Sequence, residues 1–140
     1  MAKTLIHEVV FENTTPKDLY DLYMNAEKHS MVTGGPASIS EKEGDNFSAH
    51  GGYISGRNLK LVEDQLIVQS WRAQNWDANT PDTILILHFE PQGKNTLMQM
   101  VHTNIADNNY DGIDKGWFQH YWEPWKKHLA GEAITEFAKM

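Results

Sequence analysis

The sequence predicts an α+β fold, in which a curved antiparallel β-sheet of about six to seven strands wraps around a long C-terminal α-helix, with two short helices after the first strand. Two features of the chain lead to this fold. Residues 111–129 carry apolar side chains on one half of a helical surface, and the strands expected before them follow one another through short turns. Short turns favour antiparallel pairing, and a helix with so broad an apolar face needs a large surface to cover it.

The expected C-terminal helix contains three of the five tryptophans. At about 100° per residue, one half of its surface collects the following side chains: Ile113, Trp117, Phe118, Tyr121, Trp122, Pro124, Trp125, His128 and Leu129. The asparagine or aspartate at position 108, 109 or 111 can cap its N-terminus, and Gly131 can end it. Pro124 has no N–H for the carbonyl of His120, so we expect a kink or bend there.

The rest of the chain divides into short elements. Residues 3–12 predict the first strand, and the Thr-Thr-Pro sequence at 14–16 predicts the start of a helix. A second short helix is expected over 26–31, ended by Gly-Gly-Pro at 34–36. The remaining strands are expected at 37–39, 47–50, 53–62, 66–73, 83–90 and 96–103, with hairpin turns at 63–65 and 91–94.

Composition indicates a folded domain and argues against several classes of partner. The 140 residues fit a single domain over 1–140, with 132–140 as an expected tail. The net charge of −7 argues against nucleic acid and anionic membranes, which bind surfaces rich in Lys and Arg. No apolar run is long enough to span a membrane, the N-terminus has no secretory signal, and cysteine is absent. We therefore expect a soluble cytoplasmic protein, monomeric or homodimeric.

Two stretches carry a resemblance to a known family. Residues 51–76 contain Gly-Tyr-Ile-Ser-Gly-Arg-Asn, then a hairpin, then Ile-Val-Gln-Ser-Trp-Arg. Residues 116–129 read GWFQHYWEPWKKHL. In this order and spacing, both stretches resemble the signature of the activator of heat shock protein 90 ATPase homologue family, and the likeness covers nearly the whole chain.

The resemblance implies a helix-grip fold of the START-like, or SRPBCC, superfamily, in agreement with the architecture expected from the residues. It also implies a non-enzymatic binding module with a co-chaperone or stress-related role and a chaperone ATPase as partner. In the eukaryotic co-chaperone, this module is the C-terminal half, and a separate N-terminal domain makes much of the chaperone contact. The alternative function is a carrier or sensor of a small hydrophobic ligand, held in the cavity between sheet and helix.

The candidates for lining such a ligand pocket are Tyr53, Trp71, Arg72, Trp76, Trp117, His120, Tyr121 and Trp125. Trp117, Tyr121 and Trp125 follow one another at intervals of four residues, so they share one face of the expected helix. Aromatic rings on that face can form a wall of the pocket, or they can pack as plain core between helix and sheet.

The polar candidates leave similar alternatives open. Arg72 can stack on a tryptophan, pair with a buried carboxylate or bind a ligand carboxylate. His120 lies at the border of the apolar face, where it can hydrogen-bond a ligand or be satisfied by neighbouring groups. An enzymatic function would require polar groups such as His120, Arg72 and Tyr53 to converge inside the cavity.

Signals for metal binding and catalysis are weak. His88 and His102 fall on neighbouring expected strands, but no histidine pair has the zinc-binding i, i+4 spacing with a following glutamate. No serine occupies a Gly-x-Ser-x-Gly nucleophile motif. We therefore predict no catalytic residue, no metal and no cofactor.

Overall fold

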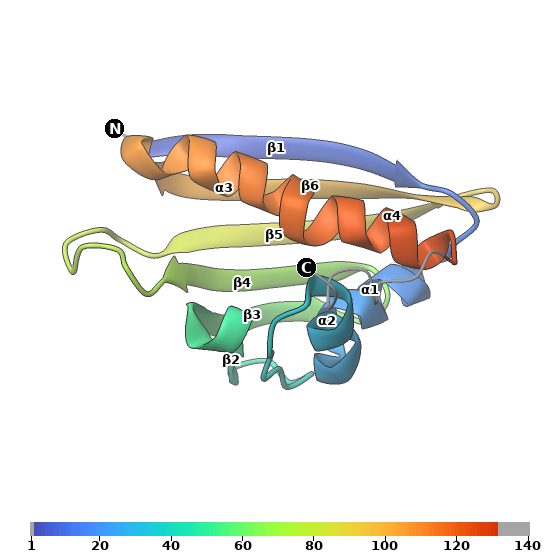
Figure 1. The fold of residues 1–140 in the computed structure, drawn as a ribbon, viewed down its shortest axis with the longest axis horizontal. Helices are drawn as coiled ribbons and strands as arrows, with labels where there is room; N and C mark the ends of the chain where they lie inside the picture. The colour runs from blue at the N-terminus through green and yellow to red at the C-terminus, as the bar shows by residue number, and fades with distance from the viewer. Residues whose placement is uncertain (1, 132–140) are drawn as a thin grey trace.

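The computed structural model describes residues 2–131. One six-stranded antiparallel sheet has the strand order β1-β6-β5-β4-β3-β2, and a long C-terminal helical segment lies along one of its faces (Figure 1). The strands are β1 (Ala2–Phe11), β2 (Asn46–Ala49), β3 (Ile54–Val62), β4 (Leu66–Ala73), β5 (Thr83–Gln92) and β6 (Asn95–Ala106). The helices are α1 (Pro16–Met24), α2 (Ala26–Thr33), α3 (Tyr110–Trp117) and α4 (Glu123–Leu129), with short turns η1 (His50–Gly52), η2 (Asp107–Asn109) and η3 (Phe118–Trp122). The predicted α+β fold is confirmed.

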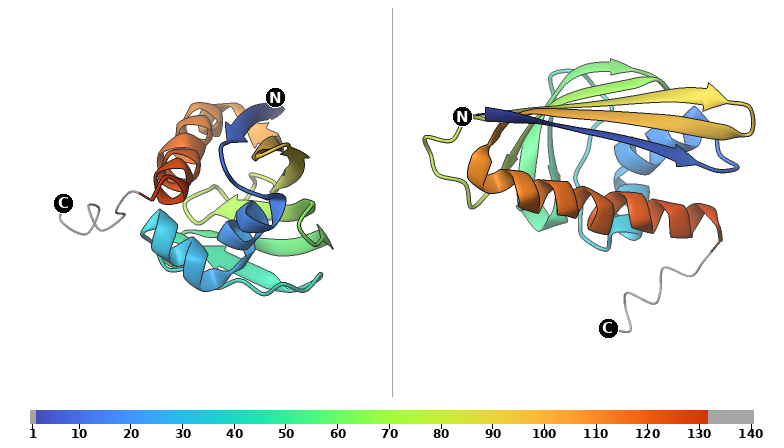
Figure 2. Two further views of the ribbon diagram at one scale, coloured as in Figure 1. Left: turned by 90° about the vertical axis from the view of Figure 1, so that its right-hand side faces the viewer. Right: turned by 90° about the horizontal axis from the view of Figure 1, so that it is seen from above.

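The core lies between the sheet and the helices, which all cover the same face of the sheet (Figure 2). Strand β5 shows the pattern, because Leu85, Leu87 and Phe89 are buried while the residues between them are partly exposed. Such alternation is expected of a strand with one face in the core. On the helical side, Trp122 and Trp125 are fully buried in the same cluster. The aromatic face of the helix is therefore covered by the sheet, as the sequence predicts.

Helices α1 and α2 close one end of the space between the sheet and α4. The hydroxyl of Thr15 accepts the backbone N–H of Asp18, and the Asp18 carboxylate accepts the N–H of Thr15, which is a capping box. The side chain of Asn25 caps α2, and Gly34 ends α2 with a φ of 81°. Helix α1 contacts β5 and α2 contacts α4, so this pair joins the two layers.

The C-terminal helical segment contains one irregular turn. Turn η3 is π-helical, and the N–H of Glu123 reaches back five residues to the carbonyl of Phe118. Pro124, which has no N–H, follows this turn at the start of α4. The irregularity expected at Pro124 therefore takes the form of a π turn directly before it. At the other end, Gly131 has a φ of 78° and donates its N–H to the carbonyl of His128, as predicted for the end of this helix.

Two details of the sheet differ from expectation. The strand predicted at 37–39 is wrong, because this stretch makes only one isolated bridge, between Ser38 and Ser48. The second hairpin turns at residues 93–94 alone, since Pro91 and Gln92 remain paired with β6. Proline is tolerated there because β4 pairs with β5 only as far as His88, so β5 needs no donor on that side.

No helix within residues 2–131 has the length and apolar character needed to cross a membrane. The expected tail at 132–140 lies outside the described residues.

Candidate ligand pocket

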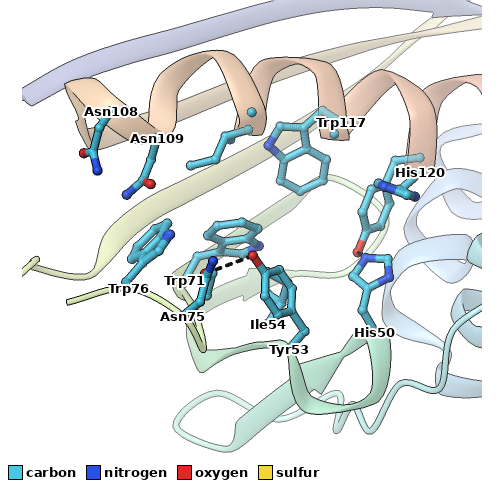
Figure 3. A pocket seen from close by; sticks show the side chains of 15 residues that line it. His50, Tyr53, Ile54, Trp71, Asn75, Trp76, Asn108, Asn109, Trp117 and His120 are labelled. Atoms are coloured by element: carbon cyan, nitrogen blue, oxygen red, sulfur yellow. Dashed lines mark hydrogen bonds between the residues drawn. The ribbon is translucent and has the colours of Figure 1, made fainter. Parts of the chain in front are cut away.

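A pocket of about 560 Å³ lies between the first half of the C-terminal helical segment and the β3–β4 side of the sheet (Figure 3). The helical segment and the turn before it contribute Asn108, Asn109, Gly112, Ile113, Gly116, Trp117, His120 and Tyr121. The opposite wall consists of His50, Tyr53, Ile54, Trp71, Ala73, Asn75 and Trp76. Neither wall alone could form the cavity, so the site depends on how the helix docks on the sheet.

Aromatic rings form most of the apolar lining. The ring centroid of Trp71 lies 5.7 Å from that of Trp76 and 6.1 Å from that of Trp117. Trp117 in turn lies 4.7 Å from Tyr121. These separations are typical of favourable aromatic packing. Trp71, Trp117 and Tyr121 are buried, so they belong to the core and line the pocket at the same time.

Two positions of the helical wall have no side chain, because both are glycine. Gly112 and Gly116 stand four residues apart on α3 and both line the pocket. A Cβ atom added at Gly112 would meet nothing within 4 Å, and one added at Gly116 would meet only the Cδ2 atom of His120 at 3.9 Å. Neither glycine has a positive φ, so the backbone does not require glycine at these positions. What the glycines provide is space in the pocket.

The hydroxyl of Tyr121 lies between two histidines at the end of the pocket nearest α2. The Nδ1 atom of His29 lies 2.8 Å from the carbonyl oxygen of Tyr23, so Nδ1 carries the proton and donates it. The Nε2 atom of His29 must then accept, and the Tyr121 hydroxyl donates to it over 2.9 Å. The oxygen of Tyr121 accepts in turn from Nε2–H of His50, at 3.1 Å. The chain of hydrogen bonds therefore has one direction, from His50 through Tyr121 to His29.

His102, on β6, hydrogen-bonds the indole of Trp117 and so fixes its position in the pocket wall. The indole Nε1–H of Trp117 donates to Nδ1 of His102 over 3.1 Å, so the proton of His102 is on Nε2. Nε2 donates to the hydroxyl of Thr83 at 2.7 Å, and this hydroxyl donates to the carbonyl of Trp71 at 2.8 Å. Every polar atom in this buried chain has a partner, which holds Trp71 and Trp117 in place.

A second Trp–His pair repeats the pattern on β1. The indole Nε1–H of Trp122 donates to Nδ1 of His7 at 3.0 Å, and Nε2–H of His7 donates to the Asp114 carboxylate at 2.6 Å. His7 therefore links two points of the helical segment to the edge strand of the sheet.

Burial determines the charge states of these groups. It lowers the pKa of His29 to about 4 and that of His102 to about 3, so both rings are neutral near pH 7. The pKa of His50 is also lowered, by burial first and by the neighbouring His120 second. Burial raises the pKa of Tyr121, which keeps its hydroxyl protonated. Tyr121 and the two histidines that hydrogen-bond to it are therefore mainly uncharged near pH 7.

Six of the eight residues predicted for the pocket line it: Tyr53, Trp71, Trp76, Trp117, His120 and Tyr121. Arg72 does not, because alternation along β4 turns it to the opposite face of the sheet from Trp71. Its guanidinium binds the carbonyl of Thr80 at 2.7 Å and the carboxylate of Asp82 at 3.0 Å. Arg72 therefore does not share the pocket with His120 and Tyr53.

Trp125 also lies outside the pocket. It is fully buried, with its ring centroid 5.7 Å from that of Phe11 and 5.2 Å from that of Trp122. Of the two alternatives left open for the helix aromatics, Trp125 is plain core.

Sequence reasoning missed part of the lining: His50, Ile54, Ala73, Asn75, Asn108, Asn109, Gly112, Ile113 and Gly116. The sequence does contain one signal for the site. Glycine disfavours a helix, so Gly112 and Gly116 in the expected helix indicate a use other than helix formation. His50 had no such signal, since it reaches the site through the η1 turn. Within residues 2–131, no three His, Cys, Asp or Glu side chains lie close enough together to share a metal ion.

Comparison with known families identifies the relationship. Residues 8–130 match the family described as Activator of Hsp90 ATPase homolog 1-like protein. The chain belongs to this family. It is 33% identical over 117 residues to an activator of 90 kDa heat shock protein ATPase homolog from Dictyostelium discoideum, covering 83% of this chain and 30% of that protein. The chain thus spans about a third of the length of the curated relatives it matches.

Solved structures of the Hsp90 activator type share the fold. An HSP90 activator from Plasmodium falciparum superimposes with a TM-score of 0.79 at 20% identity, over 95% of this chain and 98% of that one. The Aha1 dimer from Colwellia psychrerythraea gives a TM-score of 0.77 at 14% identity, over 91% and 96%. These structures confirm the START-like, helix-grip architecture and, at such low identity, the fold alone.

Proposed function

We propose that this chain is a non-enzymatic binding module that holds a small, largely apolar ligand between α3 and the β3–β4 side of the sheet. The observation that carries the proposal is the pair of helical glycines, Gly112 and Gly116, on the pocket wall. A glycine in a helix interior costs about 0.5–1 kcal/mol relative to alanine, and a glycine in the first turn, such as Gly112, costs less. An Ala methyl group would meet no steric obstacle at either position, so a chain selected for stability alone would gain from alanine there. Keeping the volume open explains the glycines.

The size and lining of the pocket support the same proposal. Ligand sites in proteins are commonly about 300–1,000 Å³, lined by apolar and aromatic groups with a few polar ones that orient the ligand. Here the aromatic lining of Trp71, Trp76 and Trp117 is combined with the imidazoles of His50 and His120. The pocket volume of about 560 Å³ falls in this range.

The first test compares masses. The mass of the purified protein is measured under native and then under denaturing conditions. A mass excess that disappears on denaturation supports the proposal and releases the compound for identification. Binding of Nile red, a neutral apolar dye, then measures the pocket directly through the increase in dye emission.

A blocked pocket provides the decisive variant. Gly112→Leu fills the cavity from the helix, and Lys115→Leu places the same side chain on an exposed helical site outside the pocket. We expect Gly112→Leu to abolish Nile red binding and Lys115→Leu to leave it unchanged, with both variants folded by circular dichroism. Equal binding by the two variants would show that the dye does not use this pocket, and would contradict the proposal.

A second function has independent support from family membership. Because the chain belongs to the Hsp90 ATPase activator homologue family, we propose that it can also bind an Hsp90-type chaperone and raise its ATP turnover. A cytoplasmic location follows from this proposal. Steady-state ATP hydrolysis by a purified Hsp90-type chaperone should increase when the protein is added. An unchanged rate at saturating protein, with direct binding also absent, would exclude this function and leave the ligand pocket unaffected.

A further inference from the structure

We infer that the pocket takes an uncharged, flat aromatic molecule that carries a hydrogen-bonding group at each end, an inference that rests on the proposed ligand-binding function. Three properties of the lining lead to this class of ligand: the absence of charge, the location of the polar groups and the partly exposed aromatic rings.

The lining has no formal charge. The chain contains 12 Lys and Arg and 19 Asp and Glu residues, yet none of these is among the 15 residues that line the pocket. A buried carboxylate or ammonium costs several kcal/mol unless an opposite charge pairs with it. Arg72, on the strand that carries Trp71, is engaged by Asp82 and by the carbonyls of Thr80 and Asp77, and its guanidinium lies 5.8 Å from the ring centroid of Trp76. A charged ligand would therefore meet no Lys, Arg, Asp or Glu side chain in the lining to pair with.

Polar side chains lie at both ends of the pocket, and Tyr53 and Asn75, which hydrogen-bond each other, lie between them. Asn108 and Asn109 stand where the helical segment begins, and His50 and His120 lie at the other end, with Trp71 and Trp117 between them (Figure 3). Asn109 and His120 are separated by 11 residues, which corresponds to roughly 16 Å along a helix. This span suits a molecule of two linked aromatic rings with a polar group at each tip.

The side chains of Asn108, Asn109 and His120 can hydrogen-bond a ligand. Among the residues that the structure describes, no side-chain hydrogen bond engages the amide groups of Asn108 and Asn109 or the imidazole of His120. The Tyr121 hydroxyl, in contrast, already donates to His29 and accepts from His50. An amide can donate and accept, and an imidazole can donate in either protonation state, so a hydroxyl or a carbonyl on the ligand fits either end.

Partly exposed aromatic rings supply the stacking surface. Tyr53 is 44% exposed although it lines the pocket, and Trp76 is only partly buried. The Tyr53 hydroxyl donates to the side chain of Asn75 at 2.9 Å, which holds the ring at the pocket wall. A flat aromatic ligand would cover these exposed faces, whereas a flexible alkyl chain would lose more conformational freedom for the same contact.

Three stilbenes of one shape test the inference. The first is trans-stilbene, the second carries a hydroxyl at the para position of each ring, and the third carries a carboxylate at each of those positions. Their affinities are measured by quenching of tryptophan fluorescence, together with Nile red as a neutral apolar reporter. Each additional hydrogen bond is expected to tighten binding about fivefold. The dihydroxylated compound should therefore bind more tightly than plain stilbene by more than tenfold, and the dicarboxylate should bind most weakly.

Variants at the two ends identify the contacts. Asn109→Leu and His120→Leu should each reduce the advantage of the dihydroxylated compound over plain stilbene about fivefold. Gln119→Leu is the matched control, because Gln119 is exposed on the same helical segment and does not line the pocket. Thermal unfolding confirms that all three variants are folded.

The outcomes separate this inference from the proposed function. If the dicarboxylate binds as tightly as the dihydroxylated compound, or if plain stilbene binds equally well, the ligand class is wrong while the pocket remains a binding site. If neither the stilbenes nor Nile red binds the folded protein, the ligand-binding function and the ligand class both fail.

Discussion

Trp117 and His102 are joined by a hydrogen bond of 3.1 Å from the indole N–H to the imidazole Nδ1, inside the core between α3 and β6. The same kind of bond ties Trp122 to His7, over 3.0 Å. Apolar packing alone permits a helix to slide or rotate on a sheet, whereas a buried donor must meet its acceptor. These histidines therefore select one position of the helix, and that position forms the pocket.

Replacing His102 should destabilise the protein strongly. In His102→Leu, the indole N–H of Trp117 is left without a partner, and the hydroxyl of Thr83 keeps only its bond to the carbonyl of Trp71. A buried polar group left without a partner costs about 1–3 kcal/mol, so we expect a loss of roughly 2–5 kcal/mol in the free energy of unfolding. Urea denaturation at pH 7 measures it. The control, His88→Leu, affects a partly exposed ring on the outer face of the sheet and should change stability by about 1 kcal/mol or less. Equal losses in both variants would contradict the role of His102.

Stability should fall on mild acidification. His29 and His102 have pKa values of about 4 and about 3 in the folded protein, below their ordinary value of 6.5. The unfolded chain therefore binds these protons more readily, and the contribution of each ring is complete above pH 6.5 and is lost as the pH falls from 6.5 toward 4 and 3. Each ring should contribute on the order of 1 kcal/mol per pH unit within that window.

The pH effect can be assigned to one ring. Urea denaturation of the wild type and of His102→Leu at pH 7 and at pH 5 gives the dependence of stability on pH in each protein. His29 and His102 together should cause a loss in the free energy of unfolding between pH 7 and pH 5. In His102→Leu about half of that loss should disappear, and in His88→Leu all of it should remain. An identical dependence in all three proteins would mean that the two buried rings do not cause the acid sensitivity.

Gly56 should not tolerate a methyl group. It lies in β3 opposite Phe47 of β2 and Trp71 of β4, and an added Cβ would overlap the backbone carbonyl of Ser70 and the ring of Phe47. Because one of these atoms is backbone, the strands themselves would have to move. We expect Gly56→Ala to cost about 3 kcal/mol, at the upper end of the usual range for overpacking. Ser55→Ala, its exposed neighbour, should stay within about 0.5 kcal/mol in the same denaturation experiment.

Gly116→Ala should raise stability and weaken ligand binding together. The position is helical and open, so alanine should add about 1 kcal/mol to the free energy of unfolding, with a smaller gain at Gly112 in the first turn of α3. The melting temperature should increase by a few degrees, and the affinity for Nile red should fall because the methyl group occupies pocket volume. A destabilised variant, or a stabilised one with unchanged binding, would show that the glycines do not serve the pocket.

Much of the fold could be predicted from the sequence because its signals are local. Thr15, Pro16 and Asp18 predict a helix start through contacts within one turn, and the structure has the capping box there. The turn after Val62 and the end of the last helix at Gly131 are equally local, and both occur as expected. The bounds of the second hairpin were less predictable, because whether Pro91 stays paired depends on how far β4 extends along β5.

The candidate site was only partly predictable for the same reason. The aromatic residues of the motif stretches suggested Trp71, Trp117 and Tyr121, since a wide apolar face must be covered. Whether such a ring packs in the core or lines the pocket depends on which residues of the sheet face it. Tyr121 lines the pocket, whereas Trp125, four residues later, does not. His29 and His50 could not be assigned at all, because they reach Tyr121 from 92 and 71 residues away along the chain.

The sequence by itself determined the order of the elements, the apolar face of the C-terminal helix and the family, because each of these is written in short-range patterns and motif spacing. Only the tertiary structure decided that Arg72 faces away from the pocket, that histidines hold the helix in position and that Gly112 and Gly116 border an open cavity. The physical reason is that hydrogen-bond partners, strand alternation at a given register and empty volume are properties of residues brought together from distant parts of the chain. They exist only once helix and sheet have packed.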